Sequence, residues 1–95
     1  MKNKLTYTFQ DHLEAQLKDA EFRKIWEETQ PEYILATQLI EKRLKKKMSQ
    51  RDLAKQAKTT QAVISRIETM QANPSLSLLK RIASILQVKL IFQFK

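Results

Sequence analysis

The chain of 95 residues has the length of one small domain, and the lack of glycine together with only two prolines favours helices over folds that depend on tight hairpin turns. It contains no cysteine, which excludes disulfides and thiolate metal sites and fits a reducing cytoplasm, and no apolar run approaches the roughly 18 residues that a membrane span needs. The formal charge of +8 is uneven: residues 1–31 carry 5 Lys or Arg and 6 Asp or Glu, whereas residues 32–95 carry 13 and 4, a net charge of +9 that is typical of a nucleic-acid binder.

Residues 1–31 are expected to form an arm with a helical second half. Alternating apolar residues at positions 5, 7 and 9 favour a short strand or an extended segment. From Asp11 onward, apolar residues recur at helical spacing, and Asp19 resembles a new N-cap at which this helix breaks or bends. The apolar stripe that follows consists of Phe22, Ile25 and Trp26. Pro31 suits the first position of a further helix, so the arm is predicted to end there.

Residues 32–87 are expected to form a bundle of short helices. The first ends in a run of three lysines, which suit the negative end of a helix dipole. Ser49 begins the second, with Asp52 three residues on in the manner of a capping box. Thr60 caps a third over residues 61–69, and a fourth follows Ser75 with an apolar face repeating every three or four residues.

The last eight residues, VKLIFQFK, change to strict alternation, which predicts a short β-strand. Its apolar face consists of Val88, Leu90, Phe92 and Phe94. Because a single strand is unstable, it must pair with residues 5–9, with a second copy of itself or with the sheet of a partner protein. Pairing with a second copy across a two-fold axis is the preferred alternative.

The second and third helices, over residues 49–69, have the pattern of a DNA-reading pair. Short helices joined by a tight turn cross steeply, so the small Ala54 suits their contact, and Leu53 and Ile64 fill the space beneath. The third helix then exposes side chains suited to a major groove, where Arg pairs with guanine and Gln with adenine. These side chains are Gln61, Ala62, Ser65, Arg66 and Thr69.

The run SQRDLAKQAKTTQAVISRIE, followed by NPSLSLLKRIASIL, resembles the helix-turn-helix of the XRE/Cro/phage-repressor group. The resemblance implies an all-α, lambda-repressor-like bundle over residues 32–87. It also implies that Gln50 clamps a phosphate and that Glu68 pairs with Arg43. The expected DNA-binding residues are Gln50, Arg51, Lys55, Lys58, Thr60, Gln61, Ala62, Ser65, Arg66 and Thr69.

Two positions depart from that family, which usually has glycine where Lys58 and Met70 stand. Both positions normally favour a left-handed backbone, where a residue with a Cβ costs on the order of 1 kcal/mol. Either the turn keeps its shape under strain or the preceding helix ends differently. We expect the first, with Lys58 reaching towards a phosphate.

The segment LKDAEFRKIWEETQPEY resembles the region ahead of the helix-turn-helix in HigA-type antitoxins, with Ala20 in place of the usual proline. The resemblance implies that residues 1–31 bind a small, basic RelE/HigB-like ribonuclease toxin and that the protein represses its own operon. The alternative for Phe22 and Trp26 is packing on their own domain. The expected toxin-binding residues are Phe22, Ile25, Trp26 and Glu27.

Residues 88–95 are the expected dimerisation segment, with contacts from Val88, Leu90, Phe92 and Phe94. A two-fold dimer would place two recognition helices about one DNA turn, roughly 34–36 Å, apart and predicts a palindromic operator. With toxin bound, the assembly would be a heterotetramer.

The sequence argues against an enzyme, because the sole histidine, His12, has no cysteine or second histidine to act with. No catalytic residue, metal site or cofactor is expected, since a phosphate-binding loop also needs glycine. The predicted function is therefore a cytoplasmic, DNA-binding antitoxin without membrane contact. The alternatives are a stand-alone phage-type repressor and a protein-interaction module that no longer binds DNA, the last disfavoured by Gln50, Gln61 and Arg66.

Overall fold

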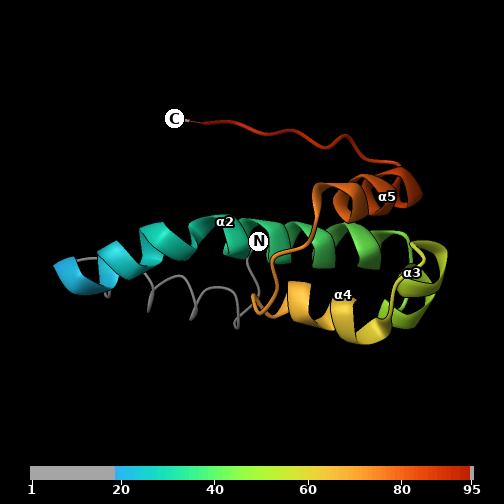
Figure 1. Ribbon diagram of the computed structural model, residues 1–95, viewed down its shortest axis with the longest axis horizontal. Helices are drawn as coiled ribbons and strands as arrows, with labels where there is room; N and C mark the ends of the chain where they lie inside the picture. Colours follow the sequence, from blue (N-terminus) through green and yellow to red (C-terminus); the bar gives the residue numbers. More distant parts are fainter. Residues whose placement is uncertain (1–18, 95) are drawn as a thin grey trace, which may run out of the picture. The chain divides into compact units, whose positions relative to one another are not determined.

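The computed structural model describes residues 19–94. This part contains the α-helices α2 (Ala20–Lys45), α3 (Gln50–Gln56), α4 (Gln61–Glu68) and α5 (Leu76–Leu86), shown in Figure 1. The all-α prediction is thus confirmed, and none of the described helices is long and apolar enough to cross a membrane. The chain divides into two compact units, residues 1–31 and 32–95. The expectations for residues 5–9 and for His12 lie outside the described residues.

Every described helix begins at a side chain that accepts backbone N–H bonds, as the cap signals in the sequence predict. These N-caps are Asp19, Ser49, Thr60 and Ser75. At the start of α3 the capping box is complete, because Ser49 Oγ accepts from Asp52 N–H at 3.0 Å and Asp52 Oδ2 accepts from Ser49 N–H at 3.2 Å. Local sequence chemistry therefore determines where the helices start.

The expected new helix at Pro31 is wrong, because Pro31 lies inside α2. Proline has no N–H, so the carbonyl four residues earlier loses its usual helical partner, but the helical backbone continues on both sides. The boundary between the two compact units falls directly after Pro31, at Glu32.

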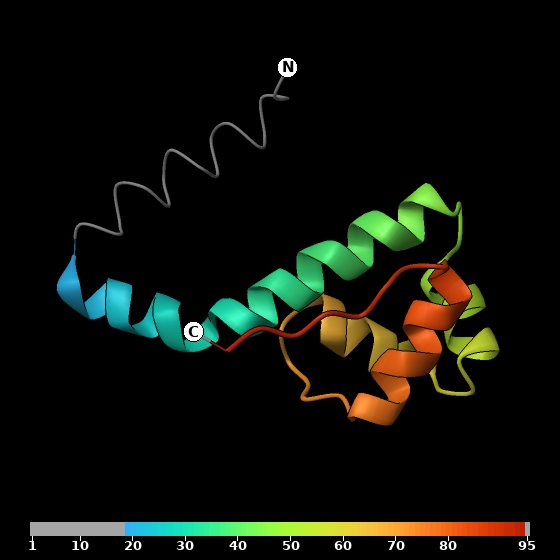
Figure 2. The same ribbon diagram turned by 90° about the horizontal axis from the view of Figure 1, so that it is seen from above.

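The core of the second unit lies where α3, α4 and α5 gather around the C-terminal half of α2 (Figure 2). The largest fully buried side chains are Leu53, Ile64 and Ile67. Ala54 is also buried, and α3 packs directly against α4. A small residue at this contact lets the two helices approach closely, as predicted.

The expected β-strand at the C-terminus is wrong for the single chain. Residues 19–94 contain no strand, and residues 88–94 follow α5 as an extended, irregular segment (Figure 1). Its first amide, Val88 N–H, donates to Ala83 O at 3.0 Å, which closes the end of α5. A strand is defined by hydrogen bonds to a neighbouring strand, and the described part of the chain offers no neighbour.

Candidate nucleic-acid interface

The exposed side of α4 carries the side chains expected to meet DNA bases. Ile64 and Ile67 face the core, so the opposite side of this helix faces solvent. Gln61, Ala62, Arg66 and Thr69 are exposed, and Ser65 is half-buried. The only acidic residue of α4, Glu68, is buried. The exposed side therefore combines one cation with hydrogen-bonding groups and has no carboxylate.

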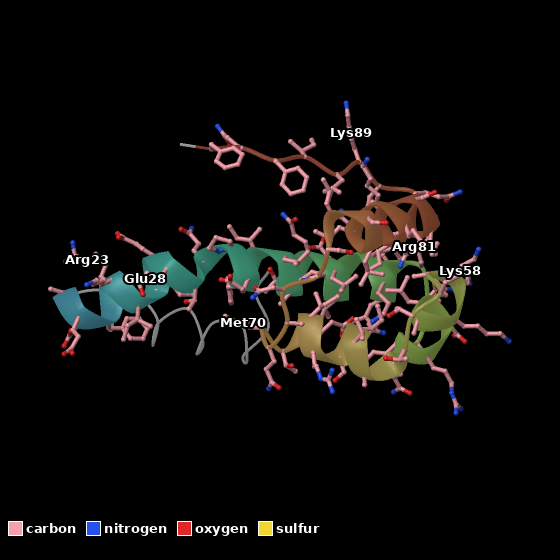
Figure 3. All side chains as sticks on the ribbon, in the orientation of Figure 1. Arg23, Glu28, Lys58, Met70, Arg81 and Lys89 are labelled. Atoms are coloured by element: carbon pink, nitrogen blue, oxygen red, sulfur yellow. The ribbon has the colours of Figure 1, made fainter. Side chains whose placement is uncertain are left out.

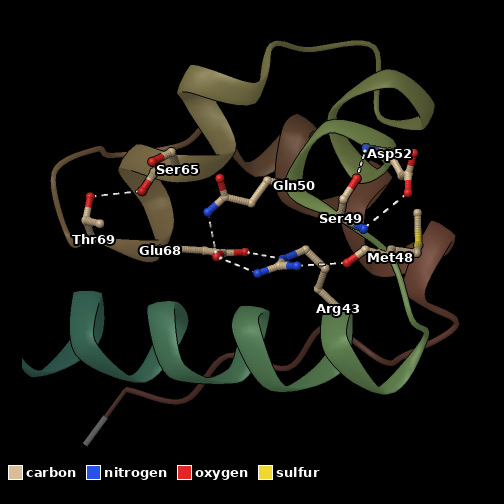
Figure 4. Close-up of polar contacts among 8 residues, drawn as sticks. All are labelled: Arg43, Met48, Ser49, Gln50, Asp52, Ser65, Glu68 and Thr69. Carbon is tan, nitrogen blue, oxygen red and sulfur yellow. Dashed lines mark hydrogen bonds and ion pairs between the residues drawn. The ribbon is translucent and has the colours of Figure 1, made fainter.

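Glu68 forms a buried ion pair with Arg43 from the end of α2 (Figure 4). Arg43 Nε donates to Glu68 Oε2 at 2.7 Å and Arg43 Nη2 donates to Glu68 Oε1 at 3.0 Å, a two-pronged contact that fixes both side chains. The hydrogen bonds to Glu68 raise the pKa of Arg43 against the opposing effect of burial. The predicted pairing of these residues is confirmed.

The same carboxylate orients Gln50, the residue expected to clamp a phosphate. Gln50 Nε2 donates to Glu68 Oε1 at 3.0 Å, and its side chain is half-buried at the start of α3. Arg43 Nη1 also donates to Met48 O at 2.8 Å, just before α3. The ion pair thus joins the end of α2 to the start of α3 and the end of α4, and it holds the Gln50 amide in a defined direction.

The turn between α3 and α4 has the left-handed backbone that the helix-turn-helix pattern predicts. Lys58 has φ 57° and Met70, after α4, has φ 64°, so both non-glycine residues adopt the conformation that favours glycine. Lys47 and Gln87, at the ends of α2 and α5, do the same. The sequence patterns did not identify these last two, because their positions are not part of the helix-turn-helix pattern.

Lys58 lies beside α5 rather than on the exposed side of α4. It lines an open hollow of about 350 Å³ together with Lys80 and Arg81, and the remaining lining residues are Gln56, Ser84 and Ile85. Figure 3 labels Lys58 and Arg81 in this region. Arg81 Nε donates to Ala57 O at 2.9 Å, which binds the last turn of α3 to α5. The sequence patterns did not identify these two cations of α5, although their adjacency on that helix was a signal.

The other expected phosphate-binding residues lie at or near the ends of the two crossed helices. Arg51 and Lys55 are exposed on α3, one helical turn apart. Thr60 caps α4, where its hydroxyl accepts from Val63 N–H at 3.2 Å. Their contact with DNA stays a prediction.

The described part of the first unit contains the expected toxin-binding residues. Ile25 is 54% exposed, whereas Phe22 and Trp26 are half-buried. Glu27 and Glu28 are exposed on the same helix. This segment therefore presents an apolar side chain on the same side of the helix as one carboxylate, that of Glu28.

The sequence of the second unit matches the family model described as helix-turn-helix over residues 39–93. The match covers α3, α4 and α5 together with the end of α2. No curated protein and no solved structure matches the chain significantly. The match nevertheless extends over more than half of the chain and includes the left-handed turn and both crossed helices. The chain therefore belongs to the XRE-like helix-turn-helix family of DNA-binding proteins.

Proposed function

We propose that this chain is a cytoplasmic transcriptional repressor. It would place α4 in the major groove of a palindromic operator. The observation that carries the proposal is the exposed side of α4, which lacks carboxylates because the one acidic residue of the helix, Glu68, is buried against Arg43. The unit over residues 32–95 adds a net charge of +9, which attracts the phosphate backbone.

The residues would divide into base readers and backbone contacts. Arg66 suits a guanine and Gln61 an adenine, while Ala62, Ser65 and Thr69 would fit against the neighbouring base edges. Gln50, Thr60 and the exposed cations of α3 suit phosphates, which position the helix without reading sequence. The residues expected to contact the DNA backbone are Gln50, Arg51, Lys55, Lys58 and Thr60.

Arg66→Ala is the test of base reading. It should cost roughly 1–3 kcal/mol on the operator and relax specificity at one base pair, whereas Lys55→Ala should weaken all sequences alike and lower the salt slope by about 1. Lys24→Ala, an exposed cation of the other unit, is the control and should change neither. Operator binding measured over a salt series separates these effects. Unchanged binding by Arg66→Ala would contradict the assignment of α4.

We further propose that the repressor is an antitoxin whose first unit binds a small, basic ribonuclease toxin. The specific observation is the exposed Ile25, which shares a side of α2 with the exposed Glu28, while Glu27 is exposed elsewhere on the same helix. An exposed apolar side chain suits burial at an interface, and carboxylates complement a basic, RNA-cleaving surface. Since Phe22 and Trp26 are half-buried, Ile25 and Glu27 are the better candidates for direct contact. The active unit would be a homodimer, and with toxin a heterotetramer.

Co-expression with the product of the adjacent reading frame tests the antitoxin role. Rescue of growth by this chain, and its loss in an Ile25→Lys, Glu27→Lys variant, would support direct neutralisation. Lys24→Ala serves again as the control, because it changes charge on the same exposed helix and should leave rescue intact. No rescue together with intact operator binding would contradict the antitoxin role and favour the stand-alone repressor.

A further inference from the structure

We propose that residues 88–94 of two copies pair as antiparallel strands in a single register that is centred on Ile91. The inference deepens the proposed homodimer and rests on it. It names the partner of the C-terminal segment as a second copy of the same segment and specifies which residues lie opposite one another.

The C-terminal segment presents an unused strand edge. After Val88, none of residues 89–94 makes a backbone hydrogen bond to the described part of the chain. Its distal side chains are open as well, since Ile91 is 73%, Phe92 59% and Phe94 100% exposed, whereas Val88 and Leu90 are half-buried. Free backbone groups beside exposed apolar side chains are the features that template pairing with another strand.

Two-fold symmetry leaves few possible registers. An antiparallel pair related by a two-fold axis sets residues of the same face opposite each other. The axis must therefore lie midway between the two copies of one residue, which is the centre of the register. Centred on Ile91, the ladder pairs position 88 with 94, 89 with 93 and 90 with 92, and so includes all seven residues. Every apolar residue of the face that begins at Val88 then meets an apolar residue of the other copy.

The neighbouring registers are worse for identifiable reasons. Centred on Phe92, the ladder sets Lys89 opposite Lys95, a like-charge pair. Centred on Leu90, it sets Phe94 opposite a residue of helix α5, so the most exposed aromatic ring remains unpaired. The register centred on Ile91 instead places Lys89 opposite the uncharged Gln93.

The backbone identifies which edge of the segment can pair. Val88 N–H is already used by Ala83 O at the end of α5. In an extended chain, alternate residues direct their N–H and C=O groups to the same edge, so the opposite edge carries the groups of Lys89, Ile91 and Gln93. These three are symmetric about Ile91, and each can exchange two hydrogen bonds with its opposite residue. Lys89 also points away from the helical body (Figure 3).

The chain has no cysteine, so single Cys variants report the register directly. Lys89→Cys, Ile91→Cys and Gln93→Cys all change exposed positions on one face of the segment. In the proposed register the two Ile91 Cα atoms lie about 5.5 Å apart, within the range of a disulfide. The two Gln93 Cα atoms are offset by four residues along the paired strands and lie about 13 Å apart, so a disulfide cannot bridge them.

Oxidation of the native protein is therefore expected to give a covalent dimer with Ile91→Cys alone. Lys89→Cys and Gln93→Cys should give none separately and a dimer when the two variants are refolded together. The same samples oxidised in urea give the level of covalent dimer that random collisions of unfolded chains produce. Ser84→Cys, exposed on α5, gives the corresponding level for a folded chain with its cysteine outside the segment.

Other patterns would overturn the register. A dimer from Ile91→Cys mixed with Gln93→Cys, but not from Ile91→Cys alone, would assign the centre to Phe92. A dimer from Lys89→Cys mixed with Ile91→Cys, but not from either alone, would assign it to Leu90. No covalent dimer above the urea level in any combination would exclude the pairing itself. Operator binding by the uncrosslinked chain is tested separately with Arg66→Ala. A failure of the strand register can therefore be distinguished from a failure of the proposed repressor function.

Discussion

Lys58→Gly is expected to make the helix-turn-helix more stable. Lys58 has φ 57°, a conformation that costs a residue with a Cβ about 1–2 kcal/mol. Glycine removes this cost, but its greater freedom in the unfolded chain offsets about 0.5–1 kcal/mol of the gain. The side chain is exposed, so little packing is lost. The net gain in the free energy of unfolding is therefore about 0.5–1 kcal/mol.

Thermal unfolding of the whole chain measures this gain. For a folded body of this size the expected rise in Tm is about 2–8 °C. The matched control is Lys55→Gly, the same exchange three residues earlier, inside α3. There the backbone is helical, so glycine should lower stability by about 1 kcal/mol. Lys58→Ala keeps the Cβ and should leave Tm nearly unchanged.

The same variant separates the two roles assigned to Lys58. If its ammonium contacts a phosphate, Lys58→Gly should weaken operator binding and lower the salt slope by about 0.9 while Tm rises. A fall in Tm would refute the argument that the turn is strained. A rise in Tm with an unchanged salt slope would support the argument that the turn is strained and contradict the phosphate contact.

Three further outcomes follow from the described contacts. Glu68→Ala should cost about 3–5 kcal/mol in urea denaturation, because it leaves Arg43 buried without its partner, and Arg43→Met combined with Glu68→Leu should restore most of the loss. Backbone and hydroxyl hydrogen bonds with Ser49 lower the pKa of Asp52. The contribution of Asp52 is thus present above its unfolded pKa and lost as the pH falls through the folded one, so Asp52→Asn should flatten the dependence of Tm on pH in acid. Adding Met70→Gly to the Lys58→Gly variant should raise Tm again, because Met70 also has a left-handed backbone. The two gains in the free energy of unfolding should add within about 0.5 kcal/mol.

The helix starts were predictable from sequence because capping is local chemistry. Ser49 and Thr60 each act on an amide three residues away, so spacing alone identifies them. The Arg43–Glu68 pair is different, since 25 positions separate its members and no periodicity relates them. That pair came from resemblance to a family, which carries information about three-dimensional contacts that local spacing lacks.

The errors lie where the sequence pattern leaves orientation or partners open. Apolar residues of the helical patterns are not all buried, since Leu44 is 58% exposed and Leu76 is 51% exposed, whereas Leu78 is buried. Helical spacing shows which residues share a face, but the direction of the core depends on neighbouring helices. Alternation in residues 88–94 likewise specifies two faces, but a strand forms only when another strand supplies hydrogen bonds.

The Glu68 carboxylate connects the stability of the fold with the residues proposed to read DNA. It accepts two hydrogen bonds from Arg43 and one from Gln50, and it lies on the helix that presents Arg66. Its burial has two consequences, because it keeps a negative charge away from the side of α4 that is proposed to face DNA and orients the amide expected to meet a phosphate. Glu68→Gln should therefore weaken operator binding even where most of the protein remains folded, since a neutral amide holds Arg43 and Gln50 less firmly. If binding and folding fell strictly in parallel across a temperature series, the carboxylate would act on stability alone.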